Sequence, residues 1–415
     1  MEKLRKIGFS RLTPLEDALE KLFSKIQLNS YEEIKVNDSL NRILAIDIVS
    51  EMNIPPFDRS AMDGYAIKAE DSFNASPKNP KKIGLVGTIE IGESSNFILN
   101  KNEGIKISTG APIPEGADAV VKIEDTEIEN DIISVYISIP PGKNVSKKGE
   151  DIKKGTHVLS GGTELKAEHI ALLTSLGFAK VKVRKKPKIS VFSSGDELLE
   201  PGTPLQPGKI YNSNTSMIST LVRIYGGIVT RGETIKDDKE VIKNKLIEAA
   251  QDSQIIIFTG GTSVGTKDYL PEIINETGTI LSHGIAQRPG SPVLIGFLSE
   301  SLIFCLPGTP VAAYVSFLKI VGLAIRKMLG CAVLDPRTEL IASISRDVPV
   351  SGLGYLHYLR VNLEKSQEGF IAIPVKLKGS GVISSLTFSD GIVEIPPHQE
   401  GLKKGDKVKV KLFPK

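Results

Sequence analysis

Between about residues 180 and 330 the sequence alternates strand-like and helix-like segments, and this alternation limits the fold most strongly. The strand-like segments, such as KISVFSS and QIIIFTG, are almost continuously apolar, and segments between them, such as KEVIKNKLIEAA, carry apolar residues at helical spacing. Strands that are apolar on both faces belong to parallel sheets that helices cover on both sides. The sequence therefore predicts an α/β domain with a central parallel sheet.

Three of the predicted strands end alike. The segments ISVFSSGDEL (189–198), IIIFTGGTSVG (255–265) and LIFCLPGTP (302–310) each pass from apolar residues into Gly with Ser or Thr, close to a helix start. The carboxyl ends of parallel strands share one edge of the sheet, where open α/β folds bind ligands. Glycine amides and helix N-termini at this edge favour a bound oxyanion such as phosphate. The alternative is that Gly and Pro only form tight turns there.

The loop after the second of these strands is similar to a nucleotide-binding P-loop but departs from it. Gly260 and Gly265 keep the G-x-x-x-x-G spacing, whereas Lys267 comes one place late and Asp268 stands where Ser or Thr would hold magnesium. We therefore expect this loop to bind an oxyanion other than a nucleoside triphosphate. Arg288, in QRPGSP, could add a positive charge nearby.

Acidic residues recur beside unusual turns, and several follow the Gly-rich strand ends. They are Asp58, Asp63, Glu150, Asp151, Asp196, Glu197, Asp237, Asp238 and Asp268. Carboxylates beside an oxyanion site imply a hard cation such as Mg²⁺ between them, because the negative charges would otherwise repel. The alternative for each acid is a solvated surface position or a helix cap. The five His residues are far apart, so a His-based metal site is not expected, and His169 and His283 are interpreted as structural.

The rest of the chain predicts further domains. Residues 14–29 and the segment ELKAEHIALLTSLG have helical spacing, and we expect these two helices to pack together in a discontinuous linker domain. Short strand-like runs dominate residues 51–140 and the last 80 or so residues. The predicted domains are a linker domain (1–50 and 141–178), a small β domain (51–140), the α/β domain (179–330) and a C-terminal β domain (331–415).

Composition excludes some classes of function. The 52 basic and 49 acidic residues leave a net charge of +3, which argues against a nucleic-acid-binding protein. The N-terminus lacks a signal-peptide core and no apolar run is long enough for a membrane span. Cys305 and Cys331 form no C-x-x-C motif, so neither zinc nor a disulfide framework is expected. A cytoplasmic protein is the expected class.

The motifs together resemble those of the molybdopterin molybdenumtransferase family, which is similar to the C-terminal domain of gephyrin. They are PPFDRSAMDGYAI, ISTGAPIPEGADAVVKIED, GEDI, SSGDEL, NSN, DD, GGTSVGTKDY, RPGSPV and LPGTPVAAYVSF, in the family's order and spacing, and GSGVISSLTFSDGIVEIP resembles its last domain. The resemblance runs from about residue 10 to the end. It implies a multidomain α/β plus β protein, with a molybdopterin-binding-like central domain, a helical linker domain, a small β domain and a C-terminal β-barrel-like domain.

The resemblance also implies a reaction and a site. Adenylylated molybdopterin would be hydrolysed with Mg²⁺, molybdate would bind the dithiolene sulfurs, and the molybdenum cofactor and AMP would leave. The protein would be a homodimer with shared active sites, with molybdopterin adenylyltransferase as a further partner. The implied catalytic residues are Asp63 and Asp151 on the partner's side and Glu197, Asp237 and Asp268 in the α/β domain, the last three also as metal ligands. The implied substrate-binding residues are Thr109, Thr259, Gly260, Gly261, Ser263, Gly265, Arg288, Pro307, Gly308 and Pro310.

Two positions depart from the family pattern, and three alternatives stay open. Ser291 stands where the family usually has Lys, and Thr309 where it often has Asn, so the affinity for the anionic substrate or the choice between molybdate and tungstate could differ. A tungsten-inserting homologue is the first alternative. The second is another enzyme of the same α/β fold, an adenylyltransferase or a pyridine-nucleotide hydrolase, although DRSAMDGYA and TGAPIPEGADAVV lie outside that domain. The third is a gephyrin-like scaffold that binds a peptide without catalysis.

Overall fold

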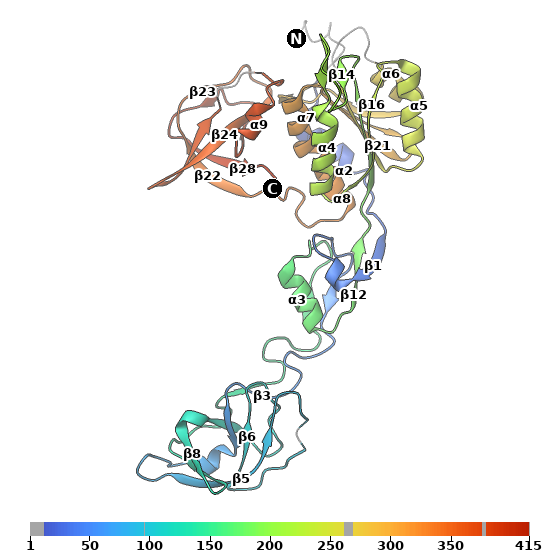
Figure 1. The fold of residues 1–415 in the computed structure, drawn as a ribbon. Coiled ribbons are helices and arrows are strands. Elements are labelled where there is room, and N and C mark those ends of the chain that lie inside the picture. The colour runs from blue at the N-terminus through green and yellow to red at the C-terminus, as the bar shows by residue number, and fades with distance from the viewer. Residues whose placement is uncertain (1–11, 95, 261–268, 376–378, 415) are drawn as a thin grey trace. The chain divides into compact units, whose positions relative to one another are not determined.

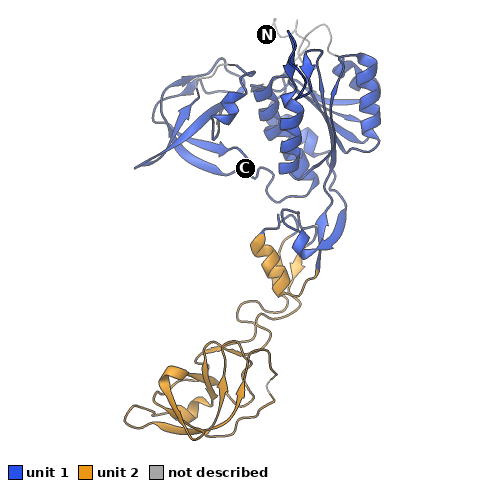
Figure 2. Cartoon of the chain, viewed as in Figure 1, with its two compact units in different colours: residues 1–46, 161–166, 180–415 blue, residues 47–160, 167–179 orange. Residues whose placement is uncertain are grey.

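The computed structural model describes residues 12–94, 96–260, 269–375 and 379–414, and the chain divides into two compact units (Figure 2). Unit 1 comprises Met1–Ile46, Gly161–Lys166 and Lys180–Lys415, and unit 2 comprises Asp47–Ser160 and Ala167–Ala179. Every helix within the described ranges falls short of the length and apolarity that crossing a membrane requires. The finer division into four domains stays a prediction.

A six-stranded sheet forms the centre of unit 1 (Figure 1). Its strand order is β16-β13-β17-β21-β20-β18. The four parallel strands are β16 (Ile228–Ile235), β13 (Lys188–Ser194), β17 (Ile255–Thr259) and β21 (Ser301–Leu306). The prediction of a parallel sheet is confirmed for these strands. An antiparallel extension, which the sequence did not predict, continues the sheet at one edge through β20 (Leu294–Leu298) and β18 (Gly278–His283).

Helices cover both faces of this sheet, as the apolar strands predicted. In β17, Ile255 and Ile257 belong to the core cluster that includes helix α4, whereas Ile256 and Phe258 belong to the cluster that includes helices α5 and α6. Their bounds are α4 (Ser213–Ile224), α5 (Lys239–Ala250) and α6 (Leu270–Thr277). A longer helical segment, α7 (Pro310–Ser316), continues through a π-helical turn at Phe317–Val321 into α8 (Gly322–Met328) and packs on the same face as α4.

The first described helix, α2 (Leu15–Phe23), corrects one expectation. It was expected to pack on the second predicted helix in the linker domain. Instead, its buried residues Leu15, Ala18 and Leu22 join the core of the α/β sheet, while α3 (Ala167–Ser175) belongs to unit 2. An amphipathic pattern shows that a helix has an apolar face but not which element covers that face.

The remaining part of unit 1 contains a short ribbon and a closed barrel. Strand β1 (Tyr31–Lys35) pairs antiparallel with β12 (Lys180–Arg184). The C-terminal region forms a five-stranded barrel, because the pairing runs in a circle through β22 (Glu339–Ile344), β25 (Gly369–Pro374), β24 (Leu356–Ser366), β26 (Gly391–Ile395) and β28 (Lys407–Leu412). This confirms the predicted barrel-like C-terminal domain. Its strand β24 also pairs with β19 (Gln287–Arg288), which joins the barrel to the α/β domain.

Unit 2 is built mainly of β-strands, as predicted for its central part. Its six-stranded sheet has the order β7-β4-β6-β5-β9-β8. These strands are β7 (Ala119–Lys122), β4 (Gly64–Ile67), β6 (Glu103–Ile107), β5 (Lys81–Ile89), β9 (Ile132–Val135) and β8 (Thr126–Glu129). Tyr65 and Ala66 lie in different core clusters, which shows that the sheet buries both faces. The pair β3 (Arg59–Ser60) and β10 (Val145–Ser146) brings the DRSAMDGYA segment next to residues 145–146.

Candidate functional site

A cavity of about 870 Å³ lies at the carboxyl ends of the four parallel strands of unit 1. Ser194 ends β13, Thr259 ends β17, Pro307 follows β21 and Asp237 follows β16 shortly after its end, and all four line the cavity. A ligand site is expected at this edge from the sequence, and the structure places a cavity there. We call it the carboxyl-edge cavity.

The wall of this cavity contains two helix N-termini. Ser213 and Asn214 begin α4, and Thr309 and Pro310 begin α7, and all four are lining residues. Free backbone N–H groups and the positive end of the helix dipole favour a negative ligand group at such a position. The two starts are tied together, because Asn214 Nδ2 donates a hydrogen bond of 2.7 Å to the Gly308 carbonyl.

Gly260 shapes the floor of the cavity because no other residue fits there. Its φ angle is +93°, and a Cβ atom at this position would lie only 2.6 Å from the Ser194 carbonyl oxygen. The backbone at Gly308 also lies close to Gly260, because a Cβ atom added to Gly308 would lie 3.3 Å from Gly260 Cα. The absence of side chains therefore lets a ligand reach the backbone where β13, β17 and β21 end.

A chain of hydroxyl groups fixes the strand ends below the cavity. Thr259 Oγ1 lies 2.6 Å from Ser193 Oγ, which lies 2.8 Å from Thr215 Oγ1 on α4. Asn212 Nδ2 donates to Thr215 Oγ1 at 2.8 Å and to Thr234 Oγ1 at 2.7 Å, while Asn212 Oδ1 accepts from Thr215 N at 3.1 Å and caps α4. These bonds join four elements, β13, β16, β17 and α4, so they hold the cavity wall rigid.

Two buried polar atoms at the cavity have open hydrogen-bonding capacity. Within the described part of the chain, Ser194 Oγ and Asn214 Oδ1 make no hydrogen bond. Both residues are buried, and both line the cavity. Buried polar atoms without a partner are rare in proteins, so these two are suited to contact a polar ligand.

The charged side chains of the cavity are all acidic within the described ranges. Glu197 and Asp237 line it, and none of its described lining residues is Lys or Arg. The Glu197 carboxylate lies against Gly195, where a Cβ atom would be 2.6 Å from both carboxylate oxygens. An anionic ligand would therefore need a cation beside these acids, or positive groups from residues other than those described.

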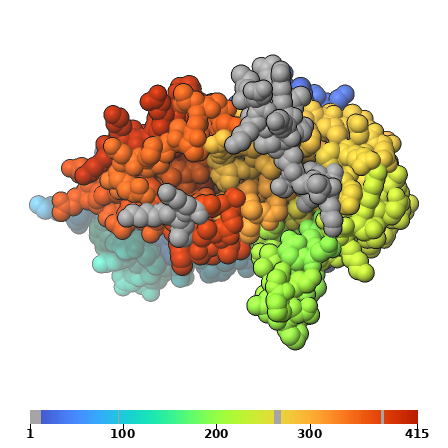
Figure 3. Space-filling model, turned by 90° about the horizontal axis from the view of Figure 1, so that it is seen from above, coloured from blue at the N-terminus to red at the C-terminus, as the bar shows by residue number. Residues whose placement is uncertain are grey.

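Residues of a short two-stranded ribbon and of the C-terminal region also line the cavity. These residues were not among the predicted site residues. Strands β14 (Leu198–Leu199) and β15 (Ile210–Tyr211) pair beside it, and the green segment between them projects from the surface in Figure 3. Ser380, Gly381 and Ile383, just before the short helix α9 (Ser384–Thr387), also line the cavity. The motifs NSN and GSGVISSLTF could have indicated Asn212, Asn214 and Ser380, because both motifs carry the family resemblance.

The structure brings together only part of the predicted site. Seven predicted residues line the carboxyl-edge cavity: Glu197, Asp237, Thr259, Gly260, Pro307, Gly308 and Pro310. Arg288 is not a lining residue, because its guanidinium lies 3.9 Å from the Tyr355 ring centre and donates to Ser351 Oγ at 3.0 Å. The predicted residues Gly261, Ser263, Gly265 and Asp268 lie outside the described residues.

The two positions that depart from the family pattern lie in different environments. Thr309 lines the cavity. Ser291 does not, although its neighbours Gly290 and Pro292 do, and its hydroxyl donates a 2.6 Å hydrogen bond to the Gln287 carbonyl.

Unit 2 holds the other predicted residues, Asp63, Asp151 and Thr109. Asp63 Oδ1 accepts hydrogen bonds from Thr109 N at 2.7 Å and from Thr109 Oγ1 at 2.9 Å. These bonds lower the pKa of the Asp63 carboxyl and keep it ionised. Asp151 is exposed, and its carboxylate bonds to none of the described residues. Asp63 and Thr109 thus lie together although they come from segments 46 positions apart, which supports treating them as one polar group.

Other acids of the predicted set have structural partners. Asp58 accepts from Lys147 Nζ at 2.8 Å and from Lys148 N at 2.8 Å, and Glu150 accepts from Lys147 N at 2.8 Å. Asp238 caps α5 by accepting hydrogen bonds of 3.0 Å from Glu240 N and Val241 N. The alternative interpretation, a helix cap or solvated turn, is therefore confirmed for Asp238 and fits the other two.

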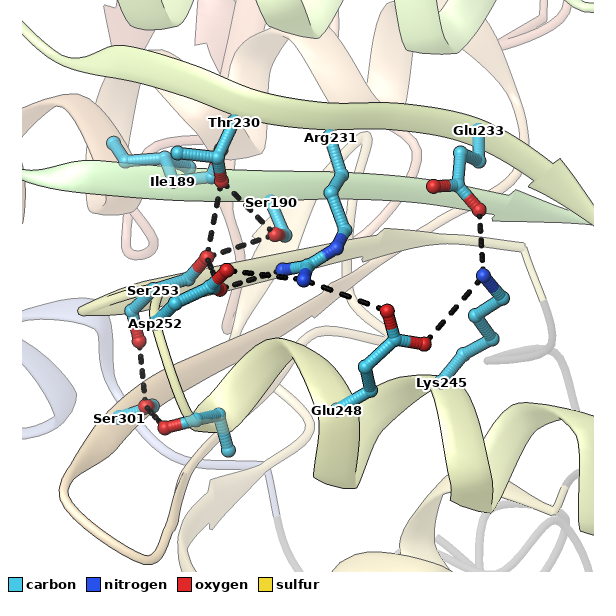
Figure 4. Close-up of polar contacts among 11 residues, drawn as sticks. Ile189, Ser190, Thr230, Arg231, Glu233, Lys245, Glu248, Asp252, Ser253 and Ser301 are labelled. Atoms are coloured by element: carbon cyan, nitrogen blue, oxygen red, sulfur yellow. Dashed lines mark hydrogen bonds and ion pairs between the residues drawn. The ribbon is translucent and has the colours of Figure 1, made fainter.

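The amino-terminal half of the sheet shows a different arrangement of charges (Figure 4). Arg231 forms ion pairs with Asp252 at 2.5 Å and Glu248 at 3.5 Å, and Lys245 joins Glu248 to Glu233. Beside these ion pairs, Ser253 Oγ lies 2.8 Å from Ser190 Oγ and 3.1 Å from Thr230 Oγ1. Each acid here has a basic partner, so this end is stabilised internally, unlike the carboxyl-edge cavity.

A metal site of the described residues would rest on two carboxylates. No group of three or more His, Cys, Asp or Glu side chains suited to a metal ion occurs in residues 12–94, 96–260, 269–375 and 379–414. Mg²⁺ is commonly held by one or two carboxylates together with substrate phosphates and water, so Glu197 and Asp237 match its needs better than those of zinc. Cys305 and Cys331 are both buried.

Comparison with protein families matches most of the chain. The family described as "MoeA N-terminal region (domain I and II)" matches residues 13–177. The "Probable molybdopterin binding domain" family matches residues 190–327, and "MoeA C-terminal region (domain IV)" matches residues 348–413. The second match contains every described lining residue of the carboxyl-edge cavity except those from the barrel.

Individual proteins are similar over nearly the whole chain. The molybdopterin molybdenumtransferase of Staphylococcus epidermidis is 35% identical over 381 residues, which covers 91% of this chain and 90% of that protein. The enzyme of the same name from Staphylococcus aureus is 33% identical over 398 residues, covering 96% and 94%. The crystal structure of the molybdopterin biosynthesis MoeA protein from Pyrococcus horikoshii is 37% identical, with a TM-score of 0.86 and coverage of 97% of this chain and 99% of that one.

Proposed function

The chain belongs to the MoeA family of molybdopterin molybdenumtransferases, and on that basis we propose that it inserts molybdenum from molybdate into adenylylated molybdopterin. Family membership places it in molybdenum cofactor biosynthesis. In the proposed reaction, water hydrolyses the phosphoanhydride bond and AMP leaves. The two dithiolene thiols bind molybdenum, and their protons leave with one molybdate oxygen as water, which gives the molybdenum cofactor. We expect it to take place in the cytoplasm.

One observation carries this proposal: four parallel strand ends and two helix N-termini meet at one cavity of about 870 Å³. The cavity is large enough for a drug-sized ligand, and its backbone N–H groups favour a phosphate. Ser194 and Asn214 offer two further polar atoms that have no partner within the described ranges. The backbone N–H groups and the Ser194 hydroxyl would donate to the pterin phosphate and the molybdate, whereas Asn214 Oδ1, an acceptor, would take a donor group of the pterin.

The acidic lining supports a role for Mg²⁺. Glu197 and Asp237 would hold the ion, with Asp268 as a third candidate outside the described residues. When bound, Mg²⁺ would neutralise the phosphate charge and stabilise the leaving AMP. The protein's own task is to position the phosphoanhydride: the amides near Gly260 and the α4 and α7 N-termini bind its oxygens, and the rigid hydroxyl chain below keeps these groups in place.

We further propose a homodimer in which unit 2 of one chain completes the carboxyl-edge cavity of the other. In this arrangement Asp63, Thr109 and Asp151 of the partner would face the substrate. The ionised Asp63 carboxylate, held by Thr109, would orient a substrate donor group or a Mg²⁺-bound water. Molybdopterin adenylyltransferase would supply the adenylylated substrate.

The test is a turnover assay with adenylylated molybdopterin, Mg²⁺ and either molybdate or tungstate, in which AMP and metal-loaded cofactor are both measured. Asp237→Asn is expected to lower AMP release on the order of a hundredfold, because a group that stabilises charge in the transition state is lost. Glu248→Gln, a change in the ion-pair network at the other end of the sheet, is the matched control and is expected to keep wild-type turnover.

The outcomes separate the alternatives. Cofactor formed with tungstate but not molybdate would identify a tungsten-inserting homologue. No AMP release under any condition, together with specific capture of a peptide, would identify a non-catalytic scaffold. Wild-type turnover by Asp237→Asn would show that the chemistry does not use the carboxyl-edge cavity as proposed.

A further inference from the structure

Unit 1 contains a second cavity, of about 420 Å³, which shares no described lining residue with the carboxyl-edge cavity. Its walls come from the linker segments at residues 40–43, 164–166 and 184–186, and from the ends of α4 and α8. Six cationic side chains line it, and the one acidic side chain among its described lining residues is Glu164. The six are Arg42, Lys166, Arg184, Lys186, Arg223 and Arg326. This concentration of charge stands out in a chain whose net charge is only +3.

Three of these cations have acidic partners. Glu164 accepts hydrogen bonds from Lys166 Nζ at 2.6 Å and from Arg326 Nη1 at 2.9 Å. Burial alone would raise the pKa of Glu164, but the hydrogen bonds from Lys166 and Arg326 outweigh burial and lower it, so the carboxylate stays ionised. Arg42 pairs with Glu32. These charges are at least partly compensated within the protein.

The other three cations have no acidic partner among the described residues. Arg184 donates to the Asn29 carbonyl at 2.9 Å and to the Ala45 carbonyl at 3.4 Å, and both acceptors are neutral. The side chains of Lys186 and Arg223 make no hydrogen bond or ion pair with other residues in the part of the chain that the structure describes. Because like charges in one cavity repel, this arrangement is stabilised when an anion binds among them.

Apolar and aromatic side chains form much of the remaining cavity wall. Ile43, Tyr225 and Leu329 are buried there, and Leu40 and Ile224 are exposed at 54% and 42%. A volume of about 420 Å³ lies within the range of small-molecule sites, which combine apolar walls with a few charged groups. An inorganic anion would use only the cations, whereas an organic phosphate would use the cations and the apolar wall.

We propose that this cavity is a second ligand site, which binds an organic phosphate of about the size of a mononucleotide. Lys186, Arg223 and Arg184 contact the phosphate, and the wall around Ile43 and Leu329 receives the organic part. This inference does not depend on the proposed transferase reaction, since the two cavities share no described lining residue.

The test measures how fast the Lys186 amine is acetylated, because a ligand bound in the cavity would shield this amine. The full chain is treated with an acetylating reagent at low salt, with and without AMP as the probe, and acetylation of each lysine is followed by mass spectrometry. At AMP concentrations about five times Kd, occupancy predicts roughly sixfold slower acetylation of Lys186. Exposed Lys365 on β24 is the internal control and is expected to react at an unchanged rate.

Two variants and two comparison ligands complete the design. Arg223→Ala is expected to abolish the protection, whereas Asn214→Ala, in the carboxyl-edge cavity, is expected to keep it. Adenosine and inorganic phosphate are each expected to protect Lys186 less than AMP does. If Asn214→Ala loses AMP release but keeps Lys186 protection, the carboxyl-edge cavity has failed while the second cavity still binds AMP. The two proposals are then tested separately.

Several results would overturn the proposal. They are no protection by AMP, equal protection of Lys365, full protection in Arg223→Ala, or equal protection by inorganic phosphate. Protection that rises with protein concentration in the absence of ligand would assign the cavity to a contact with a second copy of the chain and would also overturn it.

Discussion

Gly260 illustrates how a single residue determines the carboxyl-edge cavity. Its φ angle of +93° is unfavourable for any residue with a Cβ atom, and that atom would also collide with the Ser194 carbonyl at 2.6 Å. Gly202 offers a matched comparison, because its φ angle is +94° but nothing lies within 4 Å of its Cβ position. A comparison of Ala substitutions at the two positions therefore separates the cost of a positive φ angle from the cost of the steric collision.

We therefore expect Gly202→Ala to lower the free energy of unfolding by about 1 kcal/mol, and Gly260→Ala to lower it by clearly more. The same Gly260→Ala change should weaken phosphate binding in the cavity, because the floor must move to relieve the collision. Urea unfolding of both variants measures the first effect, and titration with the substrate measures the second. Equal destabilisation by the two changes would mean that the floor relaxes without strain.

At the same scale, the sequence indicated the strand-end residues better than the charged ones. Thr259, Gly260 and Gly308 lie where expected, because the end of an apolar strand and its glycines define a place on the sheet edge. The sequence order predicts Arg288 beside the strand-end loops, but its guanidinium stacks on Tyr355 of the C-terminal region. This contact depends on how two domains pack, which the local sequence does not show. Asn214 was missed for the same reason, since its role depends on its bond to Gly308, 94 positions away.

Among the elements, the N-terminus of α4 combines a structural cap with a place in the cavity wall. Asn212 caps α4, and Asp238 caps α5, but only Asn212 lines the carboxyl-edge cavity. Asn212→Ala and Asp238→Ala are each expected to lower stability by about 1 kcal/mol. Only Asn212→Ala should also lower turnover, because Thr215 and Thr234 lose the side chain that joins them.

Thermal melts and AMP release, measured on both variants, check this prediction. Asp238→Ala controls for the loss of a helix cap as such. If both variants lost turnover equally, general destabilisation and not the position of α4 would explain the effect.

A charge network between the α/β domain and the barrel gives an element-scale prediction on pH. Asp335 bonds to Arg337 Nε at 2.8 Å and to Lys411 Nζ at 3.0 Å, and the Arg337 side chain is fully buried. Burial alone would raise the pKa of Asp335, but Arg337 and Lys411 outweigh it and hold the pKa well below its usual range. A carboxyl with a lowered pKa stabilises the fold above its unfolded pKa of about 3.9 and loses this effect as the pH falls further.

Asp335→Asn is therefore expected to lower the free energy of unfolding by about 3 to 5 kcal/mol at pH 7, because the buried Arg337 guanidinium loses its counter-charge. The difference from wild type should shrink as the pH falls below about 4. Urea unfolding at a series of pH values measures it, with Glu368→Gln in an exposed turn as the control. A difference that stays constant from pH 7 to pH 3 would contradict the prediction.

Elements were predictable where the local pattern alone decides them. The four parallel strands and helices α4 and α5 follow from apolar spacing and caps within single segments. Strands β18 and β20 were missed because they join the sheet through antiparallel pairing with β21 and with each other, which is a long-range choice. The packing of α2 on the α/β core was likewise decided by tertiary contacts and not by its own sequence.

At the scale of the whole molecule, the proposed shared site predicts complementation between inactive chains. Asp63 lies in unit 2 and Glu197 in unit 1, so a site built from two chains would take one residue from each. A mixed dimer of Asp63→Ala and Glu197→Ala chains would contain one site with both residues intact and one site with neither. Equal mixing with full subunit exchange makes half of the dimers mixed, so about a quarter of the wild-type sites would be active.

The matched control is a mixture of Asp63→Ala and Asp151→Ala chains. Both changes lie in unit 2, so every site of every dimer would contain one damaged unit 2, and activity should stay absent. AMP release is measured before and after exchange, and exchange is verified by mass spectrometry of differently tagged chains. Recovery in the first mixture and not in the second can arise only if unit 1 of one chain works with unit 2 of another. If neither mixture recovers AMP release, Asp63 and Glu197 act in a site formed by a single chain, or Asp63 is not part of the site.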